Sequence, residues 1–281
     1  SPALMNRFRV KWIDELTQDD MTQILQERYF DIMSEELLKT CVNIHTQMQN
    51  KAKECQDGKT YYTIRHLLRW MERIKASSYK DSKDLEQAIA LEAKEVYGDG
   101  LSSLSEQDPH VGLKIFLDNL LIENLSKDYH DDNIEITADG NTLFFGEVGL
   151  KKNGERTKHI PGPTLLNTTT TKRYLKKLAK AVLRKEPLLL VGPTGGGKTS
   201  IPRYLADLIS HDFMALDLDG QTDTAQLIGQ FIPIEGEEGK YIWRDGLLVK
   251  AMREGSWLLI DEFNLADPEI LERINSLLDD D

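Results

Sequence analysis

A glycine-rich segment at 192–199 has the residue types and spacing of a phosphate-binding loop. It reads Gly-Pro-Thr-Gly-Gly-Gly-Lys-Thr and fits the pattern G-x-x-x-x-G-K-[ST]. Glycines let the backbone curl so that its N–H groups point toward phosphate oxygens. We expect Lys198 to reach the β- and γ-phosphates of a nucleoside triphosphate, and Thr199 to ligate Mg²⁺. The predicted binding residues are Gly192, Pro193, Thr194, Gly195, Gly196, Gly197, Lys198, Thr199, Ser200 and, from a second motif, Asp261.

That second motif is a pair of carboxylates, Asp261 and Glu262, which follow the apolar run 257–260. This is a Walker B pattern: a carboxylate at the end of a buried strand needs a partner, and Mg²⁺ supplies one for Asp261. Glu262 can orient and deprotonate the water that attacks the γ-phosphate. Asn264 either contacts that water or the γ-phosphate, or it caps the following segment. Together the two motifs predict hydrolysis of a nucleoside triphosphate with Mg²⁺ as cofactor.

An α/β fold is needed to position these motifs. Apolar runs predict short strands at 188–191, 213–217 and 257–260. Helices are predicted after Lys198 and over 224–230, 247–254 and 268–278, and a hairpin-like segment turns at 235–239. Because strands alternate with helices, residues 166–281 are predicted to form a parallel α/β sheet.

The first part of the chain, 1–97, has mostly helical patterning, with a possible short strand at 8–13. Thr17 and Asp20 form a capping-box pattern, and Ser34 can cap a second helix whose apolar stripe includes Cys41. A third helix is predicted to begin near Thr63. A fourth covers 84–97, before a glycine that ends it.

Residues 98–165 have mixed patterning and are predicted to link the two parts. Asp108-Pro109 can open a helix. Strands are predicted at 133–137 and 142–150, joined by Asp139-Gly140, and 149–163 is predicted to be a loop. A basic amphipathic helix is predicted at 168–185.

Composition limits the classes of partner. The chain has 47 acidic and 35 basic residues and a net charge of −12, whereas nucleic-acid binders present a basic face. The basic helix 168–185 is therefore interpreted as a solvated face. No apolar run approaches the roughly 18 residues that a membrane span needs. The histidines are scattered and the two cysteines have no metal-ligand spacing, so no further metal site is predicted, and Cys41 is interpreted as a buried thiol.

Around the two motifs the sequence resembles the AAA+ ATPases, in the branch that contains MoxR-like proteins, dynein and the midasin family. Segments 222–229 and 244–266 are similar to modules of the midasin family, although dynein shares the Asp-Glu-Phe-Asn form of the second motif. Segment 1–8 resembles the one that carries the arginine finger, which indicates Arg7. Segment 63–70 resembles the lid helix with the sensor-2 arginine, which indicates Arg65. From its position alone, Arg65 either faces an anion or is a surface arginine paired with an acid.

The resemblance implies an AAA+ fold in three parts. Residues 1–97 would be the C-terminal end and helical lid of one module, 98–165 a linker with a helix and a β-hairpin, and 166–281 the N-terminal half of the next module. In this family the ATP site lies between neighbouring modules of the same polypeptide, so Arg7 would serve a neighbouring site. The family also places a sensor-1 strand between the strands of the two motifs. Because the 281 residues lack that strand, we expect the isolated chain to be poorly stable and to hydrolyse ATP slowly or not at all.

At the level of function, the midasin-like pattern implies an ATP-driven ring that removes assembly factors from pre-60S ribosomal particles in the nucleolus and nucleoplasm. A dynein-type or MoxR-like ATPase is an alternative. A module that binds nucleotide without hydrolysing it is another, and Glu262 argues against it.

Overall fold

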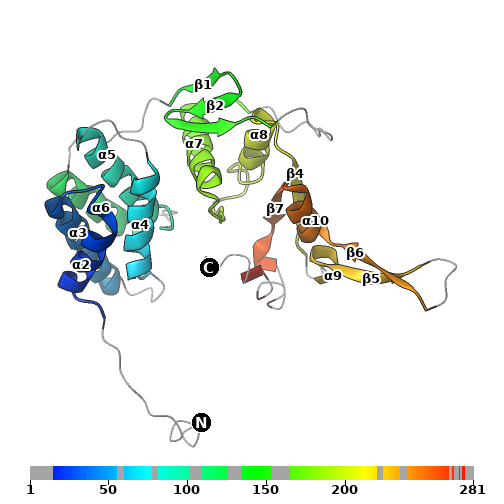
Figure 1. The fold of residues 1–281 in the computed structure, drawn as a ribbon, viewed down its shortest axis with the longest axis horizontal. Coiled ribbons are helices and arrows are strands. Elements are labelled where there is room, and N and C mark those ends of the chain that lie inside the picture. Colours follow the sequence, from blue (N-terminus) through cyan, green and yellow to red (C-terminus); the bar gives the residue numbers. More distant parts are fainter. Residues whose placement is uncertain are drawn as a thin grey trace, which may run out of the picture. The chain divides into compact units, whose positions relative to one another are not determined.

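A computed structural model describes residues 15–55, 60–77, 82–101, 109–125, 134–153, 165–219, 224–234 and 239–265, together with 268, 272, 274 and 275 (Figure 1). The chain divides into two compact units, 1–130 and 131–281, each of which is considered by itself. The short strand predicted at 8–13 lies outside the described residues. Of the helix predicted at 268–278, only the four residues named above are described, and each is helical.

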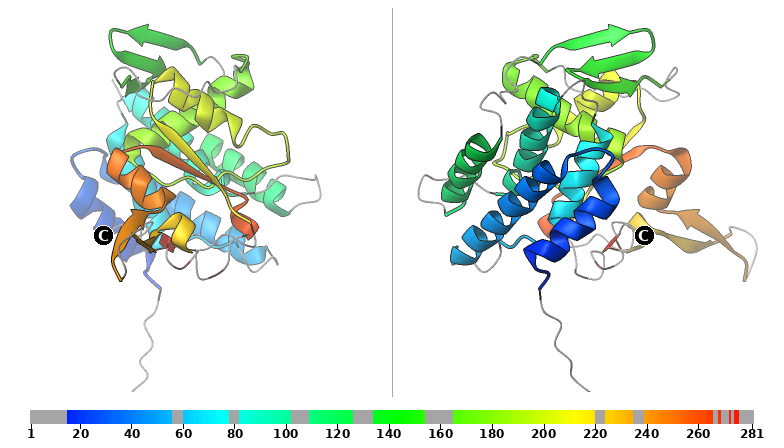
Figure 2. Two further views of the ribbon diagram at one scale, coloured as in Figure 1. Left: turned by 90° about the vertical axis from the view of Figure 1, so that its right-hand side faces the viewer. Right: turned by 60° about the vertical axis from the view of Figure 1, so that its left-hand side comes forward.

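All regular secondary structure in the described part of the first unit is helical. Its helices are α2 (Gln18–Tyr29), α3 (Glu35–Glu54), α4 (Ile64–Ala76), α5 (Ser82–Ala93), the π-helical turn η1 (Lys94–Gly98) and α6 (Pro109–Asn124). They pack side by side, with α3 against α2, α4 and α6 (Figure 2). No helix in the described part of either unit is long and apolar enough to cross a bilayer.

Two of the predicted helix starts are confirmed by their capping hydrogen bonds. The Thr17 hydroxyl accepts a hydrogen bond from the Asp20 N–H at 3.2 Å, and the Asp20 carboxylate accepts one from the Thr17 N–H at 2.9 Å. This capping box satisfies two backbone donors that the first turn of a helix leaves unpaired. The Ser34 hydroxyl caps α3 by accepting a single hydrogen bond from the Leu37 N–H at 3.4 Å.

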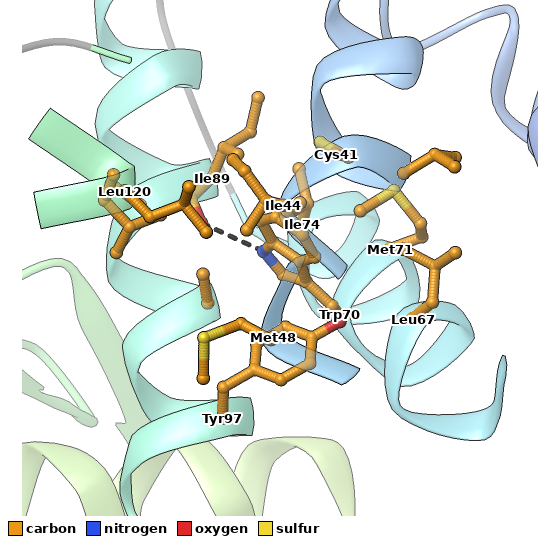
Figure 3. Packing of buried hydrophobic residues seen from close by; sticks show 14 of the residues in the cluster. Cys41, Ile44, Met48, Leu67, Trp70, Met71, Ile74, Ile89, Tyr97 and Leu120 are labelled. Atoms are coloured by element: carbon orange, nitrogen blue, oxygen red, sulfur yellow. Dashed lines mark hydrogen bonds between the residues drawn. The ribbon is translucent and has the colours of Figure 1, made fainter. Parts of the chain in front are cut away.

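The indole of Trp70 lies at the centre of the core of the first unit (Figure 3). Trp70 is fully buried, and its Nε1 donates a hydrogen bond to the Ile89 carbonyl at 2.9 Å. The Tyr97 ring meets the indole edge to face, with ring centroids 5.5 Å apart. Cys41 is fully buried as predicted, and burial raises the pKa of its thiol to about 12. The core therefore joins α3, α4, α5 and the π-helical turn.

A buried histidine in this core has only one of its two ring nitrogens paired. The Nδ1 atom of His45 lies 2.8 Å from the Tyr97 hydroxyl, while its Nε2 is buried without a hydrogen-bond partner among the described residues. Burial, with a smaller contribution from the charge of His66, lowers the pKa of His45 to about 4. The folded protein therefore holds this ring neutral at a pH where a solvated histidine takes up a proton.

We expect the first unit to lose stability as the pH falls from about 6.5 to 4. Above pH 6.5 both states leave His45 neutral, but between the two pKa values only the unfolded chain binds the proton. The free energy of unfolding should fall by about 3 kcal/mol at pH 4 relative to pH 7 from this residue alone. Urea unfolding of the wild type and His45→Gln across this range measures the effect. The carboxylates contribute equally to the wild type and to His45→Gln. If the free energy of unfolding falls by the same amount in both proteins, His45 is not the source of the pH dependence.

The second unit opens with a three-stranded antiparallel meander in the order β1 (Ile136–Asp139), β2 (Thr142–Phe145) and β3 (Val148–Lys151). The single strand predicted at 142–150 is wrong, because a tight turn at Gly146-Glu147 pairs Phe145 with Val148. Gly146 has φ +64°, a conformation that L-residues rarely adopt. The first hairpin turns at Gly140-Asn141, one residue later than predicted. The loop predicted at 149–163 is also wrong at its start, since 149–151 belong to β3.

Two helices cover this meander and lead into and out of the glycine-rich loop. α7 (Thr169–Arg184) packs on β2 and β3, and α8 (Ser200–Leu208) packs on α7. Both helices were predicted, and Thr168 caps α7 by accepting a hydrogen bond from the Thr171 N–H at 3.1 Å. Phe145, Leu175 and Leu205 are fully buried between these elements. The buried Lys176 ammonium pairs with Glu147 at 2.7 Å.

The remaining elements form a parallel strand pair and a separate hairpin. β4 (Phe213–Asp217) pairs in parallel with β7 (Trp257–Asp261), as predicted. Between them lie α9 (Thr224–Leu227), the antiparallel strands β5 (Gly229–Pro233) and β6 (Tyr241–Asp245), and α10 (Leu247–Glu254); the 3-10 turn η2 (Phe263–Leu265) follows β7. The helix predicted at 224–230 ends at Leu227, because the chain then enters β5.

The strand predicted at 188–191 is wrong. These residues pair with no strand among the described residues, and Leu188, Leu189 and Val191 are 49%, 74% and 84% exposed. A strand requires a neighbour to share its backbone hydrogen bonds. The parallel sheet in the described part of the chain contains only β4 and β7, and the AAA+ resemblance places another strand between β7 and residues 188–191. Leu190 packs against the core of this unit, while the other three residues of the run are largely exposed.

Candidate nucleotide-binding site

The glycine-rich loop adopts backbone angles that explain its glycines. Gly195 has φ +80° and Gly197 has φ +85°, both in the left-handed region. A Cβ on Gly197 would lie 2.9 Å from the end of the Ile201 side chain, which would have to shift, so the positive φ is the main reason for glycine at this position. The Gly196 N–H donates to the Pro193 carbonyl at 3.2 Å, which closes a tight turn. The loop then runs directly into the N-terminus of α8, where unpaired N–H groups favour an anion.

Lys198 bends back over this loop. Its ammonium donates hydrogen bonds to the carbonyl oxygens of Gly192 and Pro193, each at 2.9 Å. Three N–H donors on a flexible stem allow a lysine to exchange such partners for phosphate oxygens without moving the backbone. The lysine therefore already lies beside the backbone that is predicted to cradle the phosphates.

The two predicted motifs meet through one short hydrogen bond. The Thr199 hydroxyl at the start of α8 donates to Asp261 Oδ2 at 2.7 Å, across 62 positions of sequence. Asp261 ends β7, and its Oδ1 accepts the Glu262 N–H at 2.9 Å. These contacts lower the pKa of Asp261. The hydrogen bond from Thr199 has the largest effect, the one from the Glu262 N–H comes next, and the nearby charge of Lys198 lowers the pKa as well. Asp261 is thus ionised at neutral pH.

Glu262 follows Asp261 in a strained backbone conformation. Its φ is +51°, which costs an L-residue about 1–2 kcal/mol. Its carbonyl accepts a hydrogen bond from the Leu265 N–H at 2.8 Å, which begins the turn η2. The side chain is exposed and therefore reachable by water. Strained backbone of this kind is concentrated at functional sites.

The remaining predicted site residues are Arg65, Arg7 and Asn264. Arg65 belongs to the first unit, where it is exposed in the first turn of α4. That turn has no acidic residue, and no ion pair among the described residues involves Arg65. Arg7 and the side chain of Asn264 lie outside the described residues.

Asp217 was not predicted as a site residue, although the structure places it beside Asp261. The two residues are register partners at the ends of β4 and β7, and the Leu218 N–H donates to the Asp261 carbonyl at 3.1 Å. The signal was present in the sequence, because both predicted strands run into an aspartate and parallel strands end at the same edge of a sheet.

Two family models match different parts of the chain. The midasin AAA lid domain matches residues 20–114, and the AAA domain of the dynein-related subfamily matches 187–281. The helical unit matches an AAA lid. The second match contains the glycine-rich loop, whose Thr199 is hydrogen-bonded to Asp261. Together these features define an AAA protein with a P-loop-type nucleotide-binding domain. Within that class, the lid match over 20–114 makes the first unit similar to the midasins.

Individual relatives agree with this assignment. Midasin from Dictyostelium discoideum is 39% identical over 138 residues, which is 49% of this chain, and midasin from Giardia intestinalis is 38% identical over 114 residues, or 41% of it. The chain spans only about 2% of the length of either midasin. An uncharacterized protein from Staphylococcus epidermidis is 38% identical over 104 residues, which covers 36% of this chain and 40% of that protein.

Proposed function

We propose that the loop 192–199, with Asp261 and Glu262, binds ATP with Mg²⁺ and hydrolyses it. The observation that carries this proposal is the 2.7 Å hydrogen bond between Thr199 and Asp261. It joins the hydroxyl that follows the loop lysine to the carboxylate that ends β7, which is the pair that P-loop ATPases use around their metal ion. The AAA domain match over 187–281 supports the same class of activity.

The residues present suit Mg²⁺. This ion prefers hard oxygen ligands and usually keeps some of its water while binding one or two protein groups and the substrate phosphates. Thr199 offers a hydroxyl oxygen and Asp261 an ionised carboxylate within hydrogen-bonding distance of each other. When bound there, the ion would neutralise charge on the β- and γ-phosphates.

Residues of the chain itself would bind the triphosphate and activate the attacking water. Lys198 would exchange the Gly192 and Pro193 carbonyls for phosphate oxygens, and the backbone N–H groups of the loop would hold the triphosphate in place. Glu262 would accept a proton from water as its oxygen attacks the γ-phosphorus. The bond between that phosphorus and the β,γ-bridging oxygen then breaks, and ADP and phosphate leave.

Replacing Thr199 by valine is expected to weaken Mg²⁺-dependent ATP binding at this site about 10-fold or more, because the variant loses one of the two protein oxygens that would hold the metal ion. Valine keeps the branched shape and removes the hydroxyl. Thr199→Ser keeps the hydroxyl and should bind within about 2-fold of the wild type. ATP titrations at graded Mg²⁺ measure both variants in the intact protein. Equal Mg²⁺ dependence in valine and serine variants would refute a metal role for this residue.

At a larger scale, we propose that the chain is part of a multi-module ring ATPase. Residues 1–97 would form the end and lid of one module, 98–165 a linker, and 166–281 the start of the next. Arg7 and Arg65 would act as arginine finger and sensor-2 residue for a neighbouring site. The similarity to midasins supports this organisation and suggests a nuclear role in removing assembly factors from pre-60S particles. Copurification of large-subunit precursors with the intact protein tests that role, and their absence would contradict it.

A further inference from the structure

The hairpin formed by β5 and β6 carries an exposed aromatic face that the nucleotide site does not use. Phe231 is the register partner of Trp243, and Pro233 is the partner of Tyr241. Cross-strand partners and alternate residues share one face of a ribbon, so these four side chains lie together. Phe231, Tyr241 and Trp243 are 67%, 63% and 41% exposed. We call these four residues the aromatic face.

Among the described residues, the contacts that anchor the hairpin lie at its base. The Gly246 N–H donates to the Ile228 carbonyl at 2.8 Å, and a Cβ on Gly246 would lie 2.5 Å from Leu227. Leu227 of α9 and Ala251 of α10 are buried there. Beyond this base the two strands extend past α9 and α10 (Figures 1 and 2). A two-stranded ribbon with so much apolar surface is expected to have a partner.

Trp243 is held in one orientation. Its Nε1 donates to Asp245 Oδ1 at 2.7 Å, and Arg253 pairs with the other Asp245 oxygen at 3.0 Å. The Phe231 ring packs edge to face against the indole, with ring centroids 5.1 Å apart and an interplanar angle of 73°. Because the indole N–H is already satisfied, what Trp243 offers a ligand is its ring face. Such preorganisation lowers the entropy cost of binding.

In the described part of the chain, no strand pairs with the outer edge of β6. The Ile234 N–H donates to the Lys240 carbonyl, and the Gly246 N–H donates to the Ile228 carbonyl, so both of these cross-strand pairs are hydrogen-bonded. Hydrogen-bonded and non-hydrogen-bonded pairs alternate along an antiparallel ladder. The pairs that include Tyr241 and Trp243 are therefore the non-hydrogen-bonded ones, and the N–H and C=O groups of these two residues point outward. On the β5 edge, Pro233 has no N–H to offer. An extended peptide could thus add to β6 but not equally to β5.

Charge decides which ligand suits this surface. Aromatic faces stack on nucleobases or on cationic side chains. The chain has a net charge of −12, and the sequence that joins the two strands, 235–238, reads Glu-Gly-Glu-Glu. A negative field repels phosphates and attracts cations. We propose that the aromatic face and the β6 edge bind an extended, arginine- or lysine-rich segment of a partner protein.

A synthetic peptide in which arginine alternates with valine tests this proposal on the intact protein. Alternation places the arginines on one side of an added strand, over Trp243 and Tyr241. We expect the peptide to bind, to bind less tightly as salt is raised, and to lose about 10-fold or more in affinity to Trp243→Ala, because aromatic anchors dominate such interfaces. Trp243→Phe keeps a ring and should lose much less.

Three further measurements make the result decisive. A peptide with glutamate in place of arginine should not bind, and Phe30→Ala, which removes an exposed aromatic from the first unit, should leave the affinity unchanged. Tyr241→Ser replaces Trp243→Ala if the alanine variant does not fold. Equal binding of the glutamate peptide, preference for a single-stranded oligonucleotide, or self-association that occupies the hairpin would each overturn the proposal. ATP binding is a separate readout, because the aromatic face shares no residue with the loop 192–199.

Discussion

Replacing Glu262 by glutamine is expected to lower ATP turnover at this site in the intact protein by about 100-fold or more, because a general base contributes roughly 10²–10⁴-fold. Glutamine keeps the shape of the side chain but cannot accept the proton of the attacking water. The loop and the Thr199–Asp261 hydrogen bond do not depend on the Glu262 carboxylate, so ATP affinity should stay within about 2-fold of the wild type. Phosphate release and ATP binding are the two measurements.

Glu254→Gln provides a matched control for this variant. Glu254 is an exposed glutamate at the end of α10, in the same unit, and lies outside the two motifs. The same chemical change there should leave turnover unaltered. If Glu262→Gln hydrolyses ATP as fast as Glu254→Gln, Glu262 is not the general base. That result would favour the alternative that this segment binds nucleotide without hydrolysing it.

Replacing Trp70 by alanine should destabilise the first unit by about 3–5 kcal/mol, the usual cost of emptying a large aromatic site in a core. The indole is fully buried, and its loss would also leave the Ile89 carbonyl without its donor. The neighbouring Tyr97 ring would lose its edge-to-face contact. Chemical denaturation followed by the helical signal measures the change.

Tyr61→Ala is the control for the Trp70 variant. Tyr61 precedes α4 and is 70% exposed, so its removal should change stability by less than about 0.5 kcal/mol. Trp70→Phe, which keeps a ring but loses the hydrogen bond to Ile89, should fall between the two. A Trp70→Ala protein as stable as Tyr61→Ala would show that the core shown in Figure 3 does not hold the unit together.

Local signals predicted most of the helices and the parallel strand pair. Thr17 and Ser34 identify helix starts because the capping hydrogen bond is made within three residues of sequence. The run 213–217 predicts β4 because its apolar pattern is short and bounded by polar residues. These features depend on neighbours along the chain, which a sequence displays directly.

The predictions that were wrong depended on contacts between distant segments. Whether 188–191 forms a strand depends on a neighbouring strand, and the apolar pattern of Leu188 and Leu189 says nothing about whether one is present. The split at Gly146 depends on β3 folding back on β2, since the apolar pattern continues across the turn. Length and pattern alone cannot distinguish one long strand from two short ones.

The same distinction applies to the candidate site. The glycine spacing and Lys198 indicate phosphate chemistry because the loop is contiguous in sequence. The meeting of Thr199 and Asp261 follows once both are placed at the same edge of the sheet. The sequence does not predict the left-handed backbone of Glu262 or the hydrogen bonds of Lys198 to its own loop. Both features arise only when β7 and the loop are packed together.

The most direct test of the account is a structure of the intact protein with Mg²⁺ and a non-hydrolysable ATP analogue. We expect the triphosphate on the loop 192–199, Lys198 bonded to phosphate oxygens in place of the Gly192 and Pro193 carbonyls, and the metal ion beside Thr199 and Asp261. At saturating analogue, a loop without nucleotide and a Lys198 still bonded to its own backbone would contradict the account.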